Sequence, residues 1–191
     1  MPTSIPHLIA ARKYNPNASL DFYIGNIAPD VVNGEDKDTT HFRNSPDMLA
    51  AIKNFALEND PKNEYIRGIV LHLFVDYKWA EIVLADFVNR EGRGVFKSGK
   101  YREEIDRLAS DSFHSTDWAD GLYQQMLTHD IPCFVETSLI TRDGLKYTLK
   151  GQYEWATSNK LDPSTAFPMS LINEFTTNII PEFNEWSGSF L

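Results

Sequence analysis

The sequence predicts a mainly α-helical fold, a single-domain helical bundle around a long, buried central helix. Apolar residues recur at three- and four-residue intervals along most of the chain, which is the period of an amphipathic helix. The stretch 65–79 is apolar at most positions, as expected of a helix buried on most sides. With 191 residues and no internal repeat, the chain suits one domain with a sizeable core, covering 1–191.

The N-terminal half is expected to contain short helices that lead into the central one. The first begins at Ser4, a suitable N-cap, and tolerates Pro6 in its first turn. A polar, glycine-containing stretch at 30–44 predicts a loop. Apolar residues keep a regular seam along the central helix as far as Leu84. The helices expected in this half are Ser4–Tyr14, 17–27, 46–58 and 63–90.

The C-terminal half is also expected to be helical. Three glycines predict a loop at 91–99, and a break is expected near 112–115. Pro181 predicts a kink in the last helix. The periodicity of 133–140 fits a strand or a helix equally well. The helices expected here are 101–128, 141–160 and 169–186, and residues 91–191 are expected to supply the walls of a substrate pocket.

Composition excludes several classes of function. A net charge of −9 argues against nucleic-acid binding through a general basic surface and against strong attraction to anionic membranes. Cys133 is the only cysteine, so an internal disulfide and a Cys-based zinc site are excluded, and a cytoplasmic setting is expected. The sequence shows neither a signal peptide nor a charge-free span, so stable membrane insertion is not expected. The pattern favours no particular oligomeric state.

The most informative feature is the pair His72 and Asp76, four residues apart within the apolar central segment. Residues at this spacing share one face of a helix, so both side chains are expected to point the same way into the core. A buried carboxylate is costly without a partner, and a metal ion held by both residues would compensate its charge. The alternatives are a core histidine bonded to a backbone carbonyl, and an aspartate paired with Arg67 or Lys78.

Further candidate residues lie in distinctive contexts before the central helix. His7 follows Pro6 at the start of the first helix, and His41 lies near the end of the polar stretch. Between them, Pro29 is expected to hold Ala28 extended, which would end a helix and leave Asp30 at a sharp turn. Taken singly, these residues also fit a turn-stabilising aspartate and solvated histidines.

These motifs, in this order, resemble the bacterial zinc-dependent phospholipase C family, which is related to fungal single-strand nucleases. The resemblance covers roughly the first 90 residues and implies an all-helical metallohydrolase fold. The motifs are Pro6-His7, then Gly25-x-x-Ala28-Pro29-Asp30, then His41-Phe42, then His72-x-x-x-Asp76.

The resemblance assigns a role to each matching position. It implies that one zinc ion is bound by four residues and that a neighbouring zinc is bound by His7, with Asp76 bridging the two. The four residues of the first ion are Asp30, His41, His72 and Asp76. Two cations a few ångströms apart can activate a water molecule and bind a phosphate.

The chain also departs from the family, and the departures imply a reduced version of the site. Six residues precede His7, whereas the family uses a mature N-terminus to complete the second zinc site. Trp79 and Glu81 occupy the region where a further zinc-binding histidine would lie, and His114 lacks the glutamate that should follow it. Glu81, His114 or Asp117 could serve the second metal or position substrate. Asp30, Glu81 and Asp117 are the candidate catalytic carboxylates.

The expected function is therefore a metal-dependent phosphoric ester hydrolase that uses one or two zinc ions on a small-molecule or lipid phosphoester. Iron, manganese or nickel would suit the same ligands. One alternative is a helical binding protein with a closed, structural metal site. Another is an HD-type phosphohydrolase, which ranks lower because the only His-Asp pair, His129-Asp130, lies directly before Pro132 at an expected helix end. For His114 and His129 taken alone, the structural interpretation is favoured.

Overall fold

A computed structural model describes residues 4–32, 34–131, 134–135, 137 and 139–191 of the chain. The regular structure of these residues is helical, and no strand occurs among them. The mainly α-helical fold predicted from the sequence is confirmed. The helices of the first half are α1 (Ser4–Tyr14), α2 (Leu20–Gly25), the 3₁₀-helix η1 (Ala28–Val31), α3 (Glu35–Thr40), α4 (Met48–Glu58) and α5 (Glu64–Lys78). They are followed by the π-helix η2 (Trp79–Leu84), α6 (Ala85–Glu91), the 3₁₀-helix η3 (Arg93–Val95), α7 (Lys100–His114), α8 (Ala119–Thr128), α9 (Arg142–Ser158) and α10 (Met169–Ser187).

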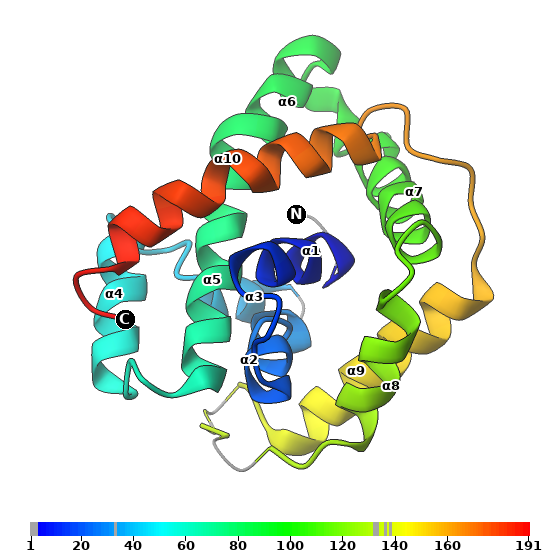
Figure 1. Cartoon of the computed structure of the whole chain (residues 1–191). Helices are drawn as coiled ribbons and strands as arrows, with labels where there is room; N and C mark the ends of the chain where they lie inside the picture. Colours follow the sequence, from blue (N-terminus) through cyan, green and yellow to red (C-terminus); the bar gives the residue numbers. More distant parts are fainter. Residues whose placement is uncertain (1–3, 33, 132–133, 136, 138) are drawn as a thin grey trace.

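The first helix, α1, lies in the middle of the molecule. In Figure 1 it is seen between α5 and α7, with α10 passing across both, and α1 contacts all three of these helices. This position follows from its composition, because the run from Ser4 to Ala11 is buried at every residue. A helix that is apolar on all sides is stable only inside the protein, and α1 therefore carries His7 into the core.

The central helix α5 begins at a well-formed cap. The Asn63 side chain accepts a hydrogen bond from the Tyr65 amide at 2.9 Å, which satisfies one of the donors that a helix start leaves unpaired. The helix then continues through the π-turn η2 into α6, so the single helix expected at 63–90 is present with a local change of pitch. Trp79, fully buried, begins the π-turn one turn after Asp76.

Two glycines allow α2 and α5 to cross at close range. A Cβ atom on Gly68 would lie 2.1 Å from the Phe22 carbonyl oxygen, and one on Gly25 would lie 2.0 Å from the Tyr65 carbonyl oxygen. No side chain fits in that space, so only glycine at both positions allows the two backbones to approach this closely. The α2–α5 contact is the most extensive between any two elements, and it places Asn26 directly against α5.

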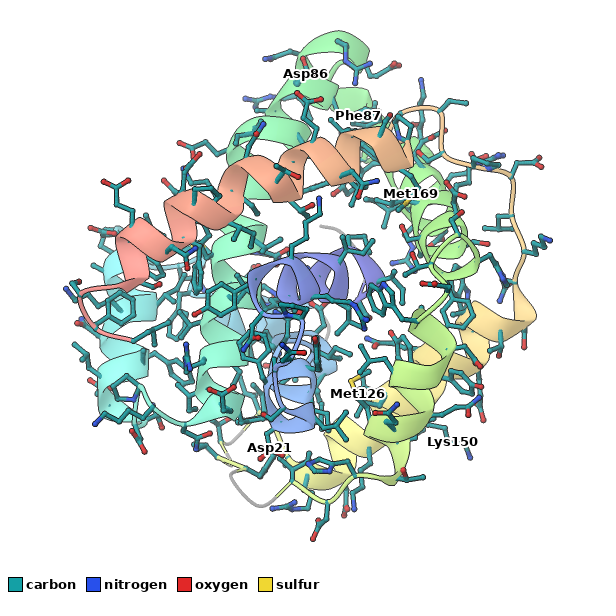
Figure 2. The ribbon with its side chains drawn as sticks, viewed as in Figure 1. Asp21, Asp86, Phe87, Met126, Lys150 and Met169 are labelled. Atoms are coloured by element: carbon teal, nitrogen blue, oxygen red, sulfur yellow. The ribbon has the colours of Figure 1, made fainter. Side chains whose placement is uncertain are left out.

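The second half of the chain surrounds α1 from the other side. Helices α7, α8 and α9 pack on one another, and α10 returns across α1 and α5. At the start of α10, Met169 lies against α7 (Figure 2), where its sulfur accepts a hydrogen bond from the Ser112 hydroxyl at 3.2 Å. None of the helices in the described ranges combines the length and apolar character needed to cross a membrane.

Several expected boundaries are corrected by the structure. The stretch 30–44 is not simply a loop, because it contains the end of η1 and the whole of α3. Ala28 is not extended, since it begins η1 with Pro29 in the first turn of that helix. The break expected near 112–115 is confirmed, because α7 ends at His114 and α8 begins at Ala119. Pro181 lies within α10, which continues to Ser187. Cys133 lies outside the described residues, and the described part of 133–140 forms neither helix nor strand.

Candidate metal centre

The pair on α5 is placed as the sequence predicts. His72 is fully buried and Asp76 is 4% exposed, and the Nε2 atom of His72 lies 3.6 Å from Asp76 Oδ2. The two basic residues of α5, Arg67 and Lys78, do not pair with Asp76. Arg67 pairs with Glu64 at 2.6 Å, and Lys78 pairs with glutamates on the surface. A lysine or arginine partner on α5 therefore does not explain this buried carboxylate.

The short elements η1 and α3 bring Asp30 and His41 to the same place. The Thr40 hydroxyl donates to the Pro29 carbonyl at 3.1 Å, which ties the end of α3 to η1. His41 follows as the C-cap residue of α3, and its side chain is fully buried. The next residue, Phe42, has a φ angle of 52°, in the left-handed region that bulky residues rarely occupy. Strain of this kind is common beside functional sites.

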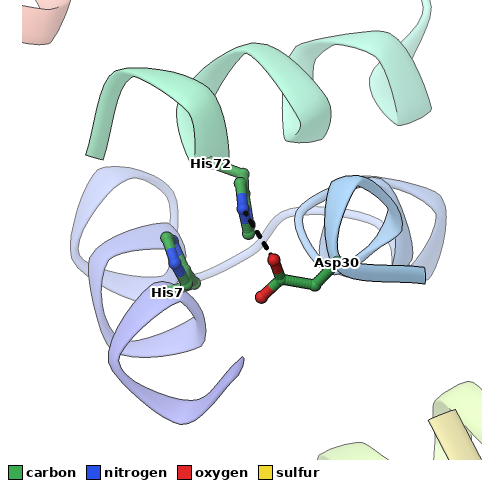
Figure 3. A group of neighbouring side chains, drawn as sticks. All are labelled: His7, Asp30 and His72. Atoms are coloured by element: carbon green, nitrogen blue, oxygen red, sulfur yellow. Dashed lines mark ion pairs between the residues drawn. The ribbon is translucent and has the colours of Figure 1, made fainter. Parts of the chain in front are cut away.

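The third element is α1, which contributes His7. Its ring stacks on that of His72 with 3.8 Å between centroids and 13° between planes. Figure 3 shows the two rings side by side, with the Asp30 carboxylate pointing toward His72. Neither ring nitrogen of His7 makes a well-formed hydrogen bond among the described residues, and its nearest charged neighbour is Asp76, 3.3 Å from Nε2.

Backbone carbonyls fix the orientation of two of the histidines. His72 Nδ1 lies 2.7 Å from the Asn26 carbonyl, and His41 Nδ1 lies 2.9 Å from the Lys37 carbonyl. A carbonyl oxygen can only accept, so each Nδ1 must carry the hydrogen. In a neutral ring the other nitrogen, Nε2, then presents a lone pair. The two Nε2 atoms face each other at 3.3 Å, and this arrangement requires a proton or a metal cation between them.

The carboxylates complete the set of ligand atoms. Asp76 Oδ2 lies 3.1 Å from His41 Nε2, so this oxygen and the two Nε2 atoms form a triangle with edges of 3.1, 3.3 and 3.6 Å. A zinc tetrahedron with bonds of about 2.0 to 2.2 Å has edges of roughly 3.3 to 3.6 Å. The triangle is therefore close in size to one face of such a tetrahedron, with one edge slightly shorter. Asp30 Oδ1, 3.3 Å from His41 Nε2 and 3.7 Å from His72 Nε2, is close enough to supply a fourth ligand.

A second ligand group overlaps the first. His7, Asp30 and His72 each offer an atom within 4.8 Å of the others, just as His41, His72 and Asp76 do. The other oxygen of Asp76, Oδ1, lies 3.3 Å from His7 Nε2. Asp76 thus has one oxygen toward His41 and the other toward His7, which is the arrangement of a carboxylate that bridges two cations.

The electrostatics favour charged carboxylates beside a neutral His7. Burial, together with the nearby His72, lowers the pKa of His7 to about 4 despite the opposing effect of Asp76. Burial alone would raise the pKa of the Asp30 and Asp76 carboxyls, but the surrounding histidines, and Lys37 at Asp30, hold both below the ordinary value. Burial lowers the pKa of His41, but Asp30 and Asp76 raise it more. The ionised carboxylates and the neutral His7 are in the protonation states that metal binding requires, whereas a protonated His41 would have to release its proton when a metal binds.

Three sequence candidates are not brought to this centre. Glu81 is exposed and pairs with Lys78 at 3.2 Å, and Asp117 is exposed. His114 is exposed and its Nε2 atom contacts the Asn159 carbonyl at 3.0 Å. None of the three belongs to a metal-binding group among the described residues. The catalytic roles expected for Glu81 and Asp117, and the ligand role expected for His114, therefore have no support from their positions.

The His129-Asp130 pair does not form an HD-type centre. His129 Nε2 contacts Asp21 Oδ1 at 2.7 Å, and the exposed Asp130 lies near Arg142. Conversely, the sequence did not identify Asn26 and Lys37, whose carbonyls orient the histidines. Of these two residues, only Lys37 could have been found from the sequence, because it precedes His41 by four residues and so lies one helical turn before it.

A cavity of about 460 Å³ opens beside the centre. Asp30 and Lys37 lie on one side of it, and residues of α7 and α9 form much of the remaining wall, including Ile105 and Trp155. Asp30 belongs both to the metal-ligand set and to the cavity lining, so the cavity reaches the centre at this residue.

Comparison of the chain with protein-family models, with curated proteins and with solved structures gives no match. The functional argument therefore depends on the residues of the centre and on the order of their motifs.

Proposed function

We propose that this protein is a metal-dependent phosphoric ester hydrolase, with zinc as the first candidate metal. The observation that carries the proposal is the convergence of two histidine Nε2 atoms, each oriented by a backbone carbonyl, with the carboxylates of Asp30 and Asp76 in a buried centre. Nitrogen and carboxylate ligands of this kind suit zinc, and iron, manganese or nickel would fit the same set.

When bound, the metal would supply an activated water molecule and stabilise the negative charge that develops on a phosphoryl oxygen. The residues of this chain would do the rest. His41, His72 and Asp76 would hold the ion. Asp30 is the only one of the candidate catalytic carboxylates that lines the cavity among the described residues, so it is the group placed to accept a proton from an attacking water molecule.

The cavity supports the proposal, because a substrate bound between Asp30 and the residues of α7 and α9 would lie beside the centre. Its lining combines charged, aromatic and aliphatic residues, which suits a phosphoester with an organic group attached. If Asp30 faces the cavity as a base, the three ligands His41, His72 and Asp76 would leave one coordination position open, whereas a structural metal site is usually closed by four protein ligands. A second metal at His7 and Asp76 would bring the centre to a two-metal arrangement, in which both the attacking and the leaving oxygen are stabilised.

The experiment is a paired measurement of metal content and turnover. Protein purified without added metal is analysed by mass spectrometry, then loaded with zinc and assayed on a chromogenic phosphomonoester and a phosphodiester. Asp76→Asn should lose both metal and activity, with a loss greater than the roughly 10- to 100-fold typical of residues that only hydrogen-bond a ligand.

Asp21→Asn is the matched control. Asp21 is also a largely buried aspartate beside a histidine, but Figure 2 shows it near the far end of α2. It should retain metal and activity. Metal binding without cleavage of either substrate class would contradict the hydrolase and leave a structural metal site.

A further inference from the structure

Lys37 is held beside the centre in a way that the ligand set does not require. Its ammonium nitrogen Nζ lies 2.5 Å from Asp30 Oδ1, and its side chain is 24% exposed. It lines the same cavity as Asp30. Its carbonyl also accepts from His41 Nδ1, so the residue that orients a candidate metal ligand also places a positive charge at the edge of the cavity.

Charge balance shows what that ammonium would do once a metal is bound. One divalent cation is neutralised by the carboxylates of Asp30 and Asp76. Lys37 is then no longer needed to compensate Asp30, and it leaves a net positive charge facing the cavity. A second cation would increase this excess. A site with surplus positive charge and a lysine at its edge favours an anion.

The other cation in the lining, among the residues that the structure describes, is differently placed. Arg102 is 77% exposed and pairs with Asp106 on its own helix at 3.0 Å. A pair of this kind is largely solvated and has no excess charge to offer. Lys37 is less exposed and lies directly on a candidate metal ligand, so it is the cation positioned to contact a group that is also bound to the metal.

We infer that Lys37 binds a phosphoryl oxygen of the substrate, next to the metal, through its Nζ. The inference rests on the proposed function and identifies a substrate-binding residue outside the metal-ligand set. Lysine binds phosphate as a point charge, so it does not depend on a particular ester group. The shared chemistry is therefore the phosphoryl group itself, in a free phosphate or in an ester.

The test separates metal binding from anion binding by calorimetry. Zinc is titrated first, unbound zinc is removed, and inorganic phosphate is then titrated into the loaded protein. The variants are Lys37→Met, which removes the charge, and Lys37→Arg, which keeps it. Lys100→Met is the control, because Lys100 also pairs with a carboxylate, that of Glu91, but does not line this cavity.

Lys37→Met should weaken phosphate binding by roughly 10- to 100-fold, the range for losing a charge-assisted hydrogen bond. Its zinc affinity should be unchanged or higher, because a positive charge beside the ion has been removed. Lys37→Arg should recover most of the phosphate affinity, and Lys100→Met should match the wild type. With a cleaved substrate, Lys37→Met should raise KM in parallel.

Two results would overturn the inference, and they are distinguishable. If all variants bind zinc and phosphate equally well, Lys37 only compensates Asp30 in the metal-free protein, and the proposed hydrolase stands. If the wild type binds no metal at all, the proposed function fails, and the inference fails with it because the anion site needs the charge of the metal.

Discussion

Replacing Gly68 with alanine tests how the fold holds the metal centre. Gly68 lies where α5 crosses α2, far from solvent, and its missing side chain lets the two backbones touch. The added methyl group would meet Phe22 O at 2.1 Å and Asn26 N at 2.7 Å. Ordinary contacts of a Cβ atom begin near 3.4 Å, so the helices would have to separate by more than an ångström.

The magnitude follows from what the methyl group meets. Both obstacles are backbone atoms, which cannot rotate away as a side chain could. Overpacking costs about 1 to 3 kcal/mol, and a clash with rigid backbone falls at the upper end of that range. A loss of about 3 kcal/mol would lower the Tm of a chain of this length by roughly 6 to 12 °C.

The assay is urea unfolding of Gly68→Ala beside Gly151→Ala. Gly151 also lies within a helix, but a Cβ added there meets nothing within 4 Å, so alanine should stabilise α9 by up to about 1 kcal/mol through helix propensity. Gly68→Ala should also weaken zinc binding, because Asn26 orients His72. Equal stability of Gly68→Ala and the wild type would refute this account of the crossing.

Three further predictions concern metal, pH and a buried hydroxyl. Zinc at about a hundredfold excess over its Kd should stabilise the protein by about 2.7 kcal/mol, seen as a rise in Tm of roughly 5 to 11 °C that a chelator reverses and that Asp76→Asn abolishes. Burial would raise the pKa of Glu104, but hydrogen bonds from Ser164 and Ala166 hold it below its ordinary value of 4.5. Since a lowered folded-state pKa stabilises only above the unfolded pKa, the stability difference between wild type and Glu104→Gln should shrink as the pH falls below 4.5 through the lowered pKa, measured by unfolding at each pH. Tyr65→Phe should leave stability unchanged or raise it by up to about 1 kcal/mol in the same unfolding assay, because the buried hydroxyl has no hydrogen-bond partner among the described residues. A loss of stability of more than about 1 kcal/mol would instead show that the hydroxyl has a partner.

The parts of the site that lie on a strong periodic pattern could be predicted from sequence. His72 and Asp76 share a helix face because α5 is long and apolar, and helix geometry alone then fixes their relation. The buried position of His7 follows similarly from the apolar run of α1. The order of the motifs pointed to Asp30 and His41, but no periodicity showed that they would meet α5.

The rest depends on contacts that local sequence does not encode. The stretch 30–44 is polar and predicts a loop. The sequence therefore gives no indication of α3, or of the position of Lys37 on that helix. Asn26 reaches His72 only because two glycines, 43 residues apart, allow α2 and α5 to touch. Glu81 shows the opposite case, since it lies close to Asp76 in sequence, but the π-turn after Lys78 leaves it on the surface.

The stability cost of the centre is itself an argument that it binds a cation. Both nitrogens of His7 and both carboxylate oxygens of Asp76 are buried and make no well-formed hydrogen bond among the described residues, and the nearest partners of Asp76 are the Nε2 atoms of His41 at 3.1 Å and His7 at 3.3 Å. A buried polar atom left without a partner costs about 1 to 3 kcal/mol, and within the part of the chain that the structure describes His7 Nδ1 has no contact that would offset this cost. Apolar side chains would fill the same space without that cost. A metal ion would use the unpartnered atoms as ligands, so the features that make this cluster costly for folding are the ones that make it suitable for binding and catalysis.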